Sequence, residues 1–462
     1  MSNKFVYVFG PSQTDGAADM KNLLGGKGAN LAEMCRLGIS VPPGLTISTE
    51  VCTVYTEQGA DTVRKLIEAD VKQGVAFVEK EMGKKFGDSA DPLLVSVRSG
   101  SRASMPGMMD TILNLGLNDE AVAGLTAKSG NERFAWDSYR RFIQMYGDVV
   151  MGLKPESKED HDPFEEIIDE IKEKKGVELD TQLDVADLKQ MVAEFKGMIR
   201  TRLGREFPTD PWEQLWGAIM AVFQSWNNDR AVFYRQMNDI PSSWGTAVNV
   251  QSMVFGNLGD SSGTGVAFTR DAATGEDVFN GEFLINAQGE DVVAGIRTPQ
   301  QITLEGSRRW AELAQVSEAD RAAKFPSLEE IMPEIYAQLI KTETSLENHY
   351  KDMQDIEFTI QEGKLWMLQT RSAKRTGAAL VRTSMEMLAQ GMIDEKTALM
   401  RVTPDRLNEL LHPVFDRSAI KSAKVIAKGL PASPGAATGQ VVFFADEAEE
   451  WVAKGKQVIL VR

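Results

Sequence analysis

The sequence predicts a mixed α+β protein with two to four domains, and three observations indicate this class. Strand-like segments between residues 246 and 293 are separated by glycine-rich loops, which favours antiparallel strands. Residues 355–360 and 365–371 alternate between polar and apolar side chains, which predicts a β-hairpin. Residues from about 119 to 210 are highly charged and follow a helical pattern. A chain of 462 residues is too long for one compact core.

Composition and charge exclude several classes of protein. The chain is 42% hydrophobic and 26% charged, as is usual for globular proteins. Its net charge of −16 argues against binding to nucleic acid, although a few arginines can still form a local positive pocket. The two cysteines, Cys35 and Cys52, have no metal-ligand spacing and indicate a reducing compartment. Because no signal peptide or membrane-spanning run is evident, we expect a cytoplasmic protein that binds no membrane.

The N-terminal region combines a short strand with a glycine-rich helix start. Residues 7–9 predict the strand, and residues 23–34 place two glycines, Lys27 and a further glycine directly before a helical pattern. Backbone N–H groups at such a helix start favour an anion, which Lys27 could reach. The spacing differs from that of a Walker loop.

The run from Ser96 to Thr111 is the most informative part of the chain. An apolar strand, residues 93–97, leads into a loop that is rich in hydrogen-bond donors and has a flexible Met-Pro-Gly-Met-Met tip. Glycines allow close approach to a ligand, and arginine forks suit phosphate recognition. We predict a phosphate-gripping lid rather than a polar surface turn, which is the alternative. Its candidate residues are Arg98, Ser99, Gly100, Ser101, Arg102, Ser104 and Gly107.

The middle of the chain predicts a helical insertion at about 119–210. Asp162-Pro163 is typical of a helix N-cap followed by proline at the first helical position. A helical period ends at Gly204, and Asp210-Pro211 begins another helix with Glu213 placed as in a capping box. We then expect strands at 246–255, 263–270 and 283–293.

The hairpin at 355–371 can bring two oxygen ligands together. Asp355, Glu357 and Thr359 share one face of the first strand, while Met367, Gln369 and Arg371 share one face of the second. A two-residue turn would leave Glu357 and Gln369 on opposite faces, whereas a three-residue loop at 362–364 pairs them and also pairs Asp355 with Arg371. We predict the three-residue loop and a Mg²⁺ site. The alternative is a half-exposed hairpin with a surface Asp–Arg pair, and the phosphate loop upstream favours the metal.

The C-terminal part indicates two further regions. Residues 375–432 predict a helical linker, and residues 433–462 begin a β-rich unit that is too short to bury a core. We therefore expect the chain to be truncated, with its first domain at 1–374.

Several motifs closely resemble those of the pyruvate phosphate dikinase family, and the resemblance covers essentially the whole chain. These motifs lie at 25–34, 96–111, 284–295, 355–371 and 411–413. The Met-Pro-Gly-Met-Met-Asp-Thr sequence at 105–111 is specific to this family. The related pyruvate, water dikinases carry a more acidic sequence there.

The resemblance implies an ATP-grasp nucleotide-binding domain, followed by a helical linker and the truncated start of a swivelling phosphohistidine domain. It implies that Lys27 and Arg98 contact the triphosphate, that the loop from Gly100 to Gly107 closes over it, and that Arg371 faces the transferred phosphates. Lys27, Arg98 and Arg371 are thus the catalytic candidates. The other implied roles are adenine contacts by Gln251, Met253 and Val254, a ribose contact by Glu290, and Mg²⁺ ligation by Glu357 and Gln369. We add Asp110, Thr111 and Asp355 as candidate nucleotide-binding residues.

In that family a histidine takes phosphate from ATP and carries it to pyruvate, giving phosphoenolpyruvate, AMP and diphosphate. His161, His349 and His412 all lack the glycine-threonine-serine context of this carrier. We therefore expect the carrier histidine and the pyruvate site in missing domains of the same enzyme, beyond Arg462. The chain alone should bind Mg·ATP as a monomer without completing the reaction, whereas the full-length family is homodimeric. The alternatives are a pyruvate, water dikinase or another ATP-grasp phosphotransferase, and a non-catalytic nucleotide-sensing module.

Overall fold

The computed structural model describes residues 4–155, 160–294, 297–411, 415–424 and 435–461. The chain divides into two compact units, each assembled from several segments. The first unit contains Met1–Val266, Glu282–Gln338 and Ile356–Arg371, and the second contains Ala267–Gly281, Leu339–Asp355 and Ser372–Arg462. The domain border that we predict at 432 lies outside the described residues. Helices and antiparallel strands are both abundant, which confirms the α+β class.

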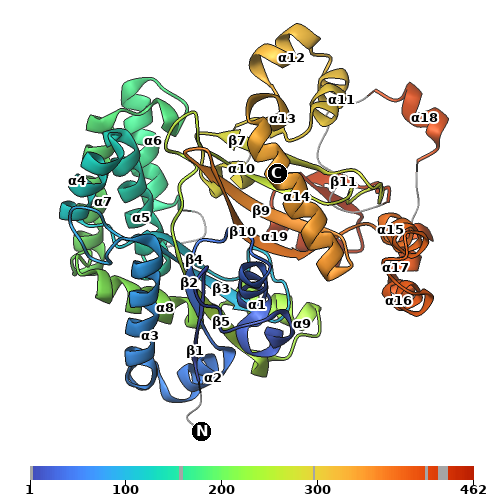
Figure 1. Ribbon diagram of the computed structural model, residues 1–462. Helices are drawn as coiled ribbons and strands as arrows, with labels where there is room; N and C mark the ends of the chain where they lie inside the picture. Colours follow the sequence, from blue (N-terminus) through green and yellow to red (C-terminus); the bar gives the residue numbers. More distant parts are fainter. Residues whose placement is uncertain (1–3, 156–159, 295–296, 412–414, 425–434, 462) are drawn as a thin grey trace. The chain divides into compact units, whose positions relative to one another are not determined.

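The first unit is organised around an antiparallel sheet in the order β1-β2-β5-β3-β4 (Figure 1). The strands are β1 (Val6–Phe9), β2 (Gly44–Ile47), β3 (Val95–Ser101), β4 (Thr111–Leu115) and β5 (Thr246–Ser252). All seven residues of the central strand β5 are buried. Helices α1 (Lys21–Arg36), α2 (Thr49–Gln58) and α3 (Ala60–Met82) pack against this sheet, and α2 and α3 contribute to its core.

Strand β3 is longer than the sequence predicts. We expected a strand at 93–97 followed by a loop, but β3 continues to Ser101 because residues 97–101 stay in regular register with β5. Their backbone groups therefore find partners in the sheet, which overrides the loop-like composition. The connecting segment is consequently shorter, at 102–110, and Thr111 already begins β4 opposite Arg98.

The region that we predict as a helical insertion is largely helical, and it belongs to the first unit (Figure 1). Its helices are α4 (Asp119–Ser129), α5 (Glu132–Val149), α6 (Pro163–Lys175) and α7 (Val185–Leu203), followed by α8 (Pro211–Ser225) and α9 (Asp229–Met237). Asp162 and Asp210 cap α6 and α8 as their positions predict. Glu213 is paired with Arg64 at 2.9 Å, and its predicted capping-box contact does not occur among the described contacts of α8.

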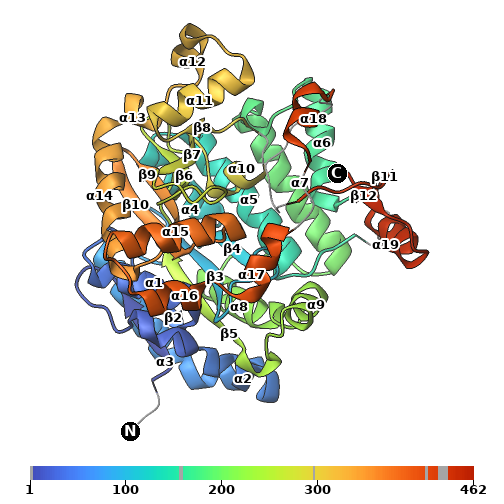
Figure 2. The same cartoon turned by 90° about the vertical axis from the view of Figure 1, so that its right-hand side faces the viewer.

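A second sheet has the strand order β10-β9-β6-β7-β8, and most of its residues belong to the first unit. The strands are β6 (Gly263–Phe268), β7 (Asn280–Ile285), β8 (Gln300–Gln301), β9 (Gln354–Gln361) and β10 (Lys364–Ser372). Figure 2 shows helices α11 (Leu304–Ala314), α12 (Glu318–Lys324) and α13 (Leu328–Ile331) beyond β7 and β8. Our prediction of a strand at 283–293 is wrong in its second half, where the chain forms α10 (Gly289–Ala294). The Asp291 side chain accepts a hydrogen bond from the N–H of Gln288, which stabilises the start of this helix.

The second unit is largely helical. It contains most of α14 (Pro333–Tyr350), followed by α15 (Gly377–Ala389), α16 (Glu395–Arg401), α17 (Pro404–Asn408) and α18 (Arg417–Ser422). Near its C-terminus, β11 (Gln440–Val442) pairs in parallel with β12 (Val458–Leu460), and α19 (Ala445–Ala453) connects the two strands. Across the described residues of both units, we find no helix with the length and apolarity needed to cross a membrane.

Candidate functional site

Glycines allow α1 to lie directly on the backbone of the first sheet. Gly25 has φ 67° and ψ 171°, which interrupts α1, and a Cβ at this position would lie 1.7 Å from the carbonyl oxygen of Gly100. A Cβ on Gly28 would lie 2.7 Å from Thr46 and 2.9 Å from the side-chain oxygen of Asn249. Only glycine fits such close approaches. The helical segment that begins after Gly25 therefore starts directly beside β3, and it carries Lys27 there.

Lys27 belongs to a cluster of charged side chains from four elements of the first unit. Arg98 on β3 forms an ion pair with Glu357 on β9, with 3.3 Å between Nη2 and Oε2, and both side chains are less than a third exposed. Burial, together with the positive charges of Arg98 and Arg371, lowers the pKa of Lys27 to about 7, and Glu357 acts in the opposite direction. Lys27 thus lies within electrostatic range of two further basic groups and one carboxylate. Basic side chains that gather in a partly buried position favour the binding of an anion.

The hairpin connection differs from our prediction. Its turn has two residues, Glu362 and Gly363, with φ of 49° and 74°, and not the three residues that we expected. Positive φ at both positions is typical of the tight turn that matches the twist of paired strands. The Gln369 amide nitrogen nevertheless donates to Glu357 over 3.1 Å. Since a regular ladder from a two-residue turn would separate these side chains, the register must shift by one residue along the hairpin.

Glu357 and Gln369 are close enough to offer two oxygens to one divalent cation. The amide nitrogen of Gln369 faces the carboxylate in this structure, and rotation of the amide would present its oxygen instead. Within the described residues, no cluster of three or more His, Cys, Asp or Glu side chains has metal-binding geometry. A cation held here would therefore take its remaining ligands from substrate oxygens and water, as Mg²⁺ commonly does.

The 102–110 segment lies against α9 and the residues that follow it. Arg230 contacts the segment twice, through a 3.1 Å hydrogen bond from Nε to the Met108 carbonyl and through an ion pair with Asp110. Asn228 donates to the other carboxylate oxygen of Asp110 over 3.2 Å. The guanidinium of Arg102 lies over the Trp244 ring, 5.6 Å from its centroid. Asp110, which we counted as a nucleotide-binding candidate, is thus already bound to α9 in this structure.

Alternation along β3 separates the predicted phosphate ligands into two groups. Arg98 and Gly100 share one face of the strand, and Ser99 and Ser101 share the other. The hydroxyl of Ser101 also donates to the carbonyl of Ala103. The side chains of the two serines therefore point away from the face that carries Arg98, while Ser104 and Gly107 are exposed in the connecting segment.

Gln251, predicted to contact adenine, has a structural role in the sheet. Its amide donates to the Pro42 carbonyl over 3.0 Å, and its backbone pairs with β2 and β3 on both sides. The N–H of Met253 donates to the Leu94 carbonyl, directly after β5 ends. The adenine contacts by Gln251, Met253 and Val254 therefore stay a prediction, and the side chain of Val254 is buried.

Two other candidates have less structural information. Glu290 lies in α10, but its side chain is outside the described part of the structure. Asp355 lies buried on β9 in the second unit, so that its predicted pairing with Arg371 stays a prediction. His412 also lies outside the described residues.

Several residues of the site could not be found from the sequence. Asn30 donates to the carbonyl of Thr370 over 2.7 Å and so joins α1 to β10 beside Gln369 and Arg371. Arg230 and Trp244 contact the 102–110 segment from more than 100 residues away in the chain. No local motif marks these three residues, because their roles arise from pairings between distant elements.

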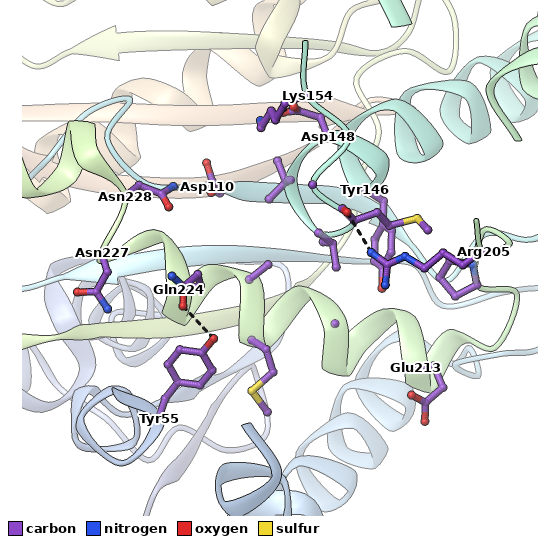
Figure 3. Close-up of a pocket in the computed structure, with 18 of the residues that line it drawn as sticks. Tyr55, Asp110, Tyr146, Asp148, Lys154, Arg205, Glu213, Gln224, Asn227 and Asn228 are labelled. Atoms are coloured by element: carbon purple, nitrogen blue, oxygen red, sulfur yellow. Dashed lines mark hydrogen bonds and ion pairs between the residues drawn. The ribbon is translucent and has the colours of Figure 1, made fainter. Parts of the chain in front are cut away.

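A cavity of about 980 Å³ lies elsewhere in the first unit, among the end of α5, α8 and the start of α9. Figure 3 shows Asp110 and Asn228 at one end of this cavity and Arg205 and Glu213 at the other. Of the predicted site residues whose side chains the structure describes, only Asp110 lines it. The cavity is therefore separate from the cluster around Lys27.

The site is thus a cluster of basic side chains around Lys27, with the carboxylate of Glu357, in the first unit of an α+β protein. The chain belongs to the family of the pyruvate phosphate dikinase AMP/ATP-binding domain, which matches residues 21–392. It is 55% identical to the pyruvate, phosphate dikinase of Rhizobium meliloti (strain 1021) and 54% identical to that of Clostridium symbiosum. Each alignment covers 99% of this chain and 49% of the relative.

A chloroplastic pyruvate, phosphate dikinase of Mesembryanthemum crystallinum is 53% identical over 99% of this chain and 45% of its own length. The chain therefore spans about half the length of the curated relatives that it matches. The predicted family resemblance is confirmed by these matches.

Proposed function

We propose that this chain is the ATP-binding part of a pyruvate, phosphate dikinase, with an ATP-grasp fold in the nucleotide-binding region. In the complete enzyme, ATP, pyruvate and phosphate would be converted to AMP, phosphoenolpyruvate and diphosphate. The proposal rests on family membership together with one observation. Lys27 on α1 and Arg98 on β3 lie with Glu357 and Arg371, which come from a hairpin more than 250 residues further along the chain.

The charge of this cluster fits a polyphosphate. Lys27 lies within electrostatic range of Arg98 and Arg371, and phosphate oxygens would accept hydrogen bonds from these basic groups. Arg98 and Arg371 carry permanent charge, whereas Lys27 can gain its proton when an anion binds, because its pKa is lowered to about 7. Their proposed role in catalysis is to position the transferred phosphate and to neutralise its charge.

Glu357 and Gln369 would hold Mg²⁺ beside these groups. Their side chains lie 3.1 Å apart, which suits two ligands of one cation. When bound, the cation would neutralise charge on the phosphate oxygens. The Glu357 carboxylate would then exchange its contact with Arg98 for one with the metal, which frees the arginine for phosphate.

The chemistry requires an acceptor for the phosphate. We propose that a histidine in a further domain of the same enzyme accepts it, and that a separate pyruvate-binding domain completes the reaction. We also propose that the present chain is monomeric and cytoplasmic. The two free cysteines of the described structure support a reducing compartment.

Calorimetric titration of the chain with ATP, with and without Mg²⁺, tests this function. We expect saturable binding at one site that requires Mg²⁺ and weakens at least about tenfold in Arg98→Ala. The matched control is Arg64→Ala, because Arg64 also pairs with a glutamate, Glu213, but lies on α3 in an exposed position. Equal weakening by both substitutions, or no binding by the unmodified chain, would contradict the proposal.

A further inference from the structure

The contacts between α9 and the 102–110 segment share one chemical property. Each contact engages a hydrogen-bond acceptor of the segment. Tyr234 donates to the Ser104 carbonyl over 3.5 Å, Arg230 donates to the Met108 carbonyl, and Arg230 and Asn228 together bind both oxygens of Asp110. Residues of α9, together with Asn228 at its N-cap, therefore bind hydrogen-bond acceptors of the segment, including its one carboxylate.

The positively charged hydrogen-bond donor of the segment, Arg102, has a different environment. Arg102 lies over the Trp244 ring, and its buried Nε has no hydrogen-bond partner among the described residues. An aromatic face supports the guanidinium without neutralising its charge. The segment consequently keeps its positive charge, while its carboxylate is bound by Arg230.

We propose that α9 acts as a clasp for the 102–110 segment, in which Arg230 masks the Asp110 carboxylate so that the segment presents positive charge to a polyphosphate. This inference rests on the proposed function, because it assumes that the segment faces an anionic ligand. Arg230 is then a positioning residue that acts through Asp110. Asp110 itself is assigned to the clasp and not to direct contact with the nucleotide.

The burial of the pair supports this assignment. The Asp110 side chain is 14% exposed, whereas Arg230 is 53% exposed. Loss of Arg230 would leave a mostly buried carboxylate with Asn228 as its remaining described partner. An unmasked negative charge in a loop that serves phosphate would oppose binding, and this opposition would weaken as salt is raised.

A double-mutant experiment on the full chain tests the clasp, with calorimetric titration of Mg·ATP and of inorganic tripolyphosphate. We expect Arg230→Ala to weaken binding of both ligands about tenfold. The substitution Asp110→Asn should maintain or tighten binding, and the double variant should recover to within about threefold of Asp110→Asn. Arg230→Lys, which keeps the charge, should retain most of the affinity.

The effect of Arg230→Ala should also diminish between about 0.05 M and about 0.5 M salt. Arg64→Ala is the control for a lost exposed ion pair, and thermal melting checks that each variant is folded. A double variant as weak as Arg230→Ala would overturn the masking role and leave only support of the Met108 carbonyl. A weakened Asp110→Asn would show that Asp110 binds the ligand directly. If the unmodified chain binds neither ligand, the proposed function fails and the clasp fails with it, whereas normal binding with no response to Arg230→Ala rejects the clasp alone.

Discussion

Arg98 and Glu357 are 259 residues apart in the chain, and their side chains form an ion pair of 3.3 Å. Arg98 belongs to the first sheet and Glu357 to the second. This ion pair therefore joins the two sheets at the position where Lys27, Gln369 and Arg371 also converge.

The substitution Glu357→Gln should uncouple nucleotide binding from Mg²⁺. Without its carboxylate the pair with Gln369 loses the charged ligand for a cation, and the basic groups lose their internal counter-ion. We expect the enhancement of ATP affinity by Mg²⁺ to fall at least about tenfold, while metal-free binding tightens. Titration with ATP over a range of MgCl₂ concentrations measures both effects. Glu213→Gln is the control, and an unchanged Mg²⁺ dependence in Glu357→Gln would argue against the metal site.

Binding of ATP should be accompanied by proton uptake near neutral pH. The pKa of Lys27 is about 7 in the unliganded chain, and phosphate beside it would raise this pKa. Above pH 7 the lysine is partly neutral before binding, so that uptake should approach one proton as pH rises towards 9, and it should disappear below about pH 6. Titrations in buffers of different ionisation enthalpy measure this uptake. Lys27→Met should abolish it, and persistence in that variant would assign the proton to another group.

The lowered pKa of Lys27 also predicts how the free energy of unfolding changes with pH. Unfolded Lys27 has a pKa near 10.5, so that between pH 7 and 10.5 the unfolded chain binds more protons than the folded chain. The free energy of unfolding should therefore rise with pH through this window, as far as Lys27 contributes. Denaturant unfolding of the unliganded chain and of Lys27→Met, compared across pH, isolates the contribution. Identical slopes for the two proteins would contradict the lowered pKa.

The substitution Gly25→Ala should prevent α1 from packing normally on the sheet. A Cβ would overlap the Gly100 carbonyl at 1.7 Å, in a position that already has positive φ. We expect a loss of about 3 kcal/mol or more in the free energy of unfolding, together with loss of ATP binding. Gly38→Ala is a matched control, because Gly38 also has positive φ, of 73°, but a Cβ there meets no described atom within 4 Å. Gly38→Ala should lower the free energy of unfolding by about 1 kcal/mol. Equal losses in the two variants would show that backbone strain, and not overlap with Gly100, causes the loss in Gly25→Ala.

Arg270 should be a major source of stability in the second unit. Its side chain is 1% exposed and binds Glu347 at 2.7 Å, with further contacts to Glu386 and Gln390. Arg270→Met leaves the buried Glu347 without this partner, and we expect a loss of about 3–5 kcal/mol in the free energy of unfolding. Arg382→Met serves as the control, since Arg382 is 45% exposed and should contribute less than about 1 kcal/mol. Chemical denaturation compares the two variants, and equal small losses would contradict the prediction.

Much of the fold could be predicted from the sequence where local chemistry decides the structure. The caps of α6 and α8, the helical insertion and the strand signals all follow from short-range patterns. The same patterns were less reliable where tertiary pairing competes with composition. Residues 98–101 have the composition of a loop but join β3, because β5 supplies hydrogen-bond partners for their backbone.

The candidate site, like the fold, combines features that local sequence patterns predict with features that depend on tertiary packing. The sequence by itself singled out Lys27, Arg98, Glu357, Gln369 and Arg371 as candidate site residues, since glycine-rich basic loops and alternating strands are local signals. The predicted contact between Glu357 and Gln369 is confirmed, but only the tertiary structure showed that it forms with a two-residue turn and that Asp110 is bound by Arg230. The physical reason is that side-chain contacts depend on register and on the packing of distant elements. A one-residue shift in a strand reverses the face on which a side chain lies, and no short stretch of sequence encodes that shift.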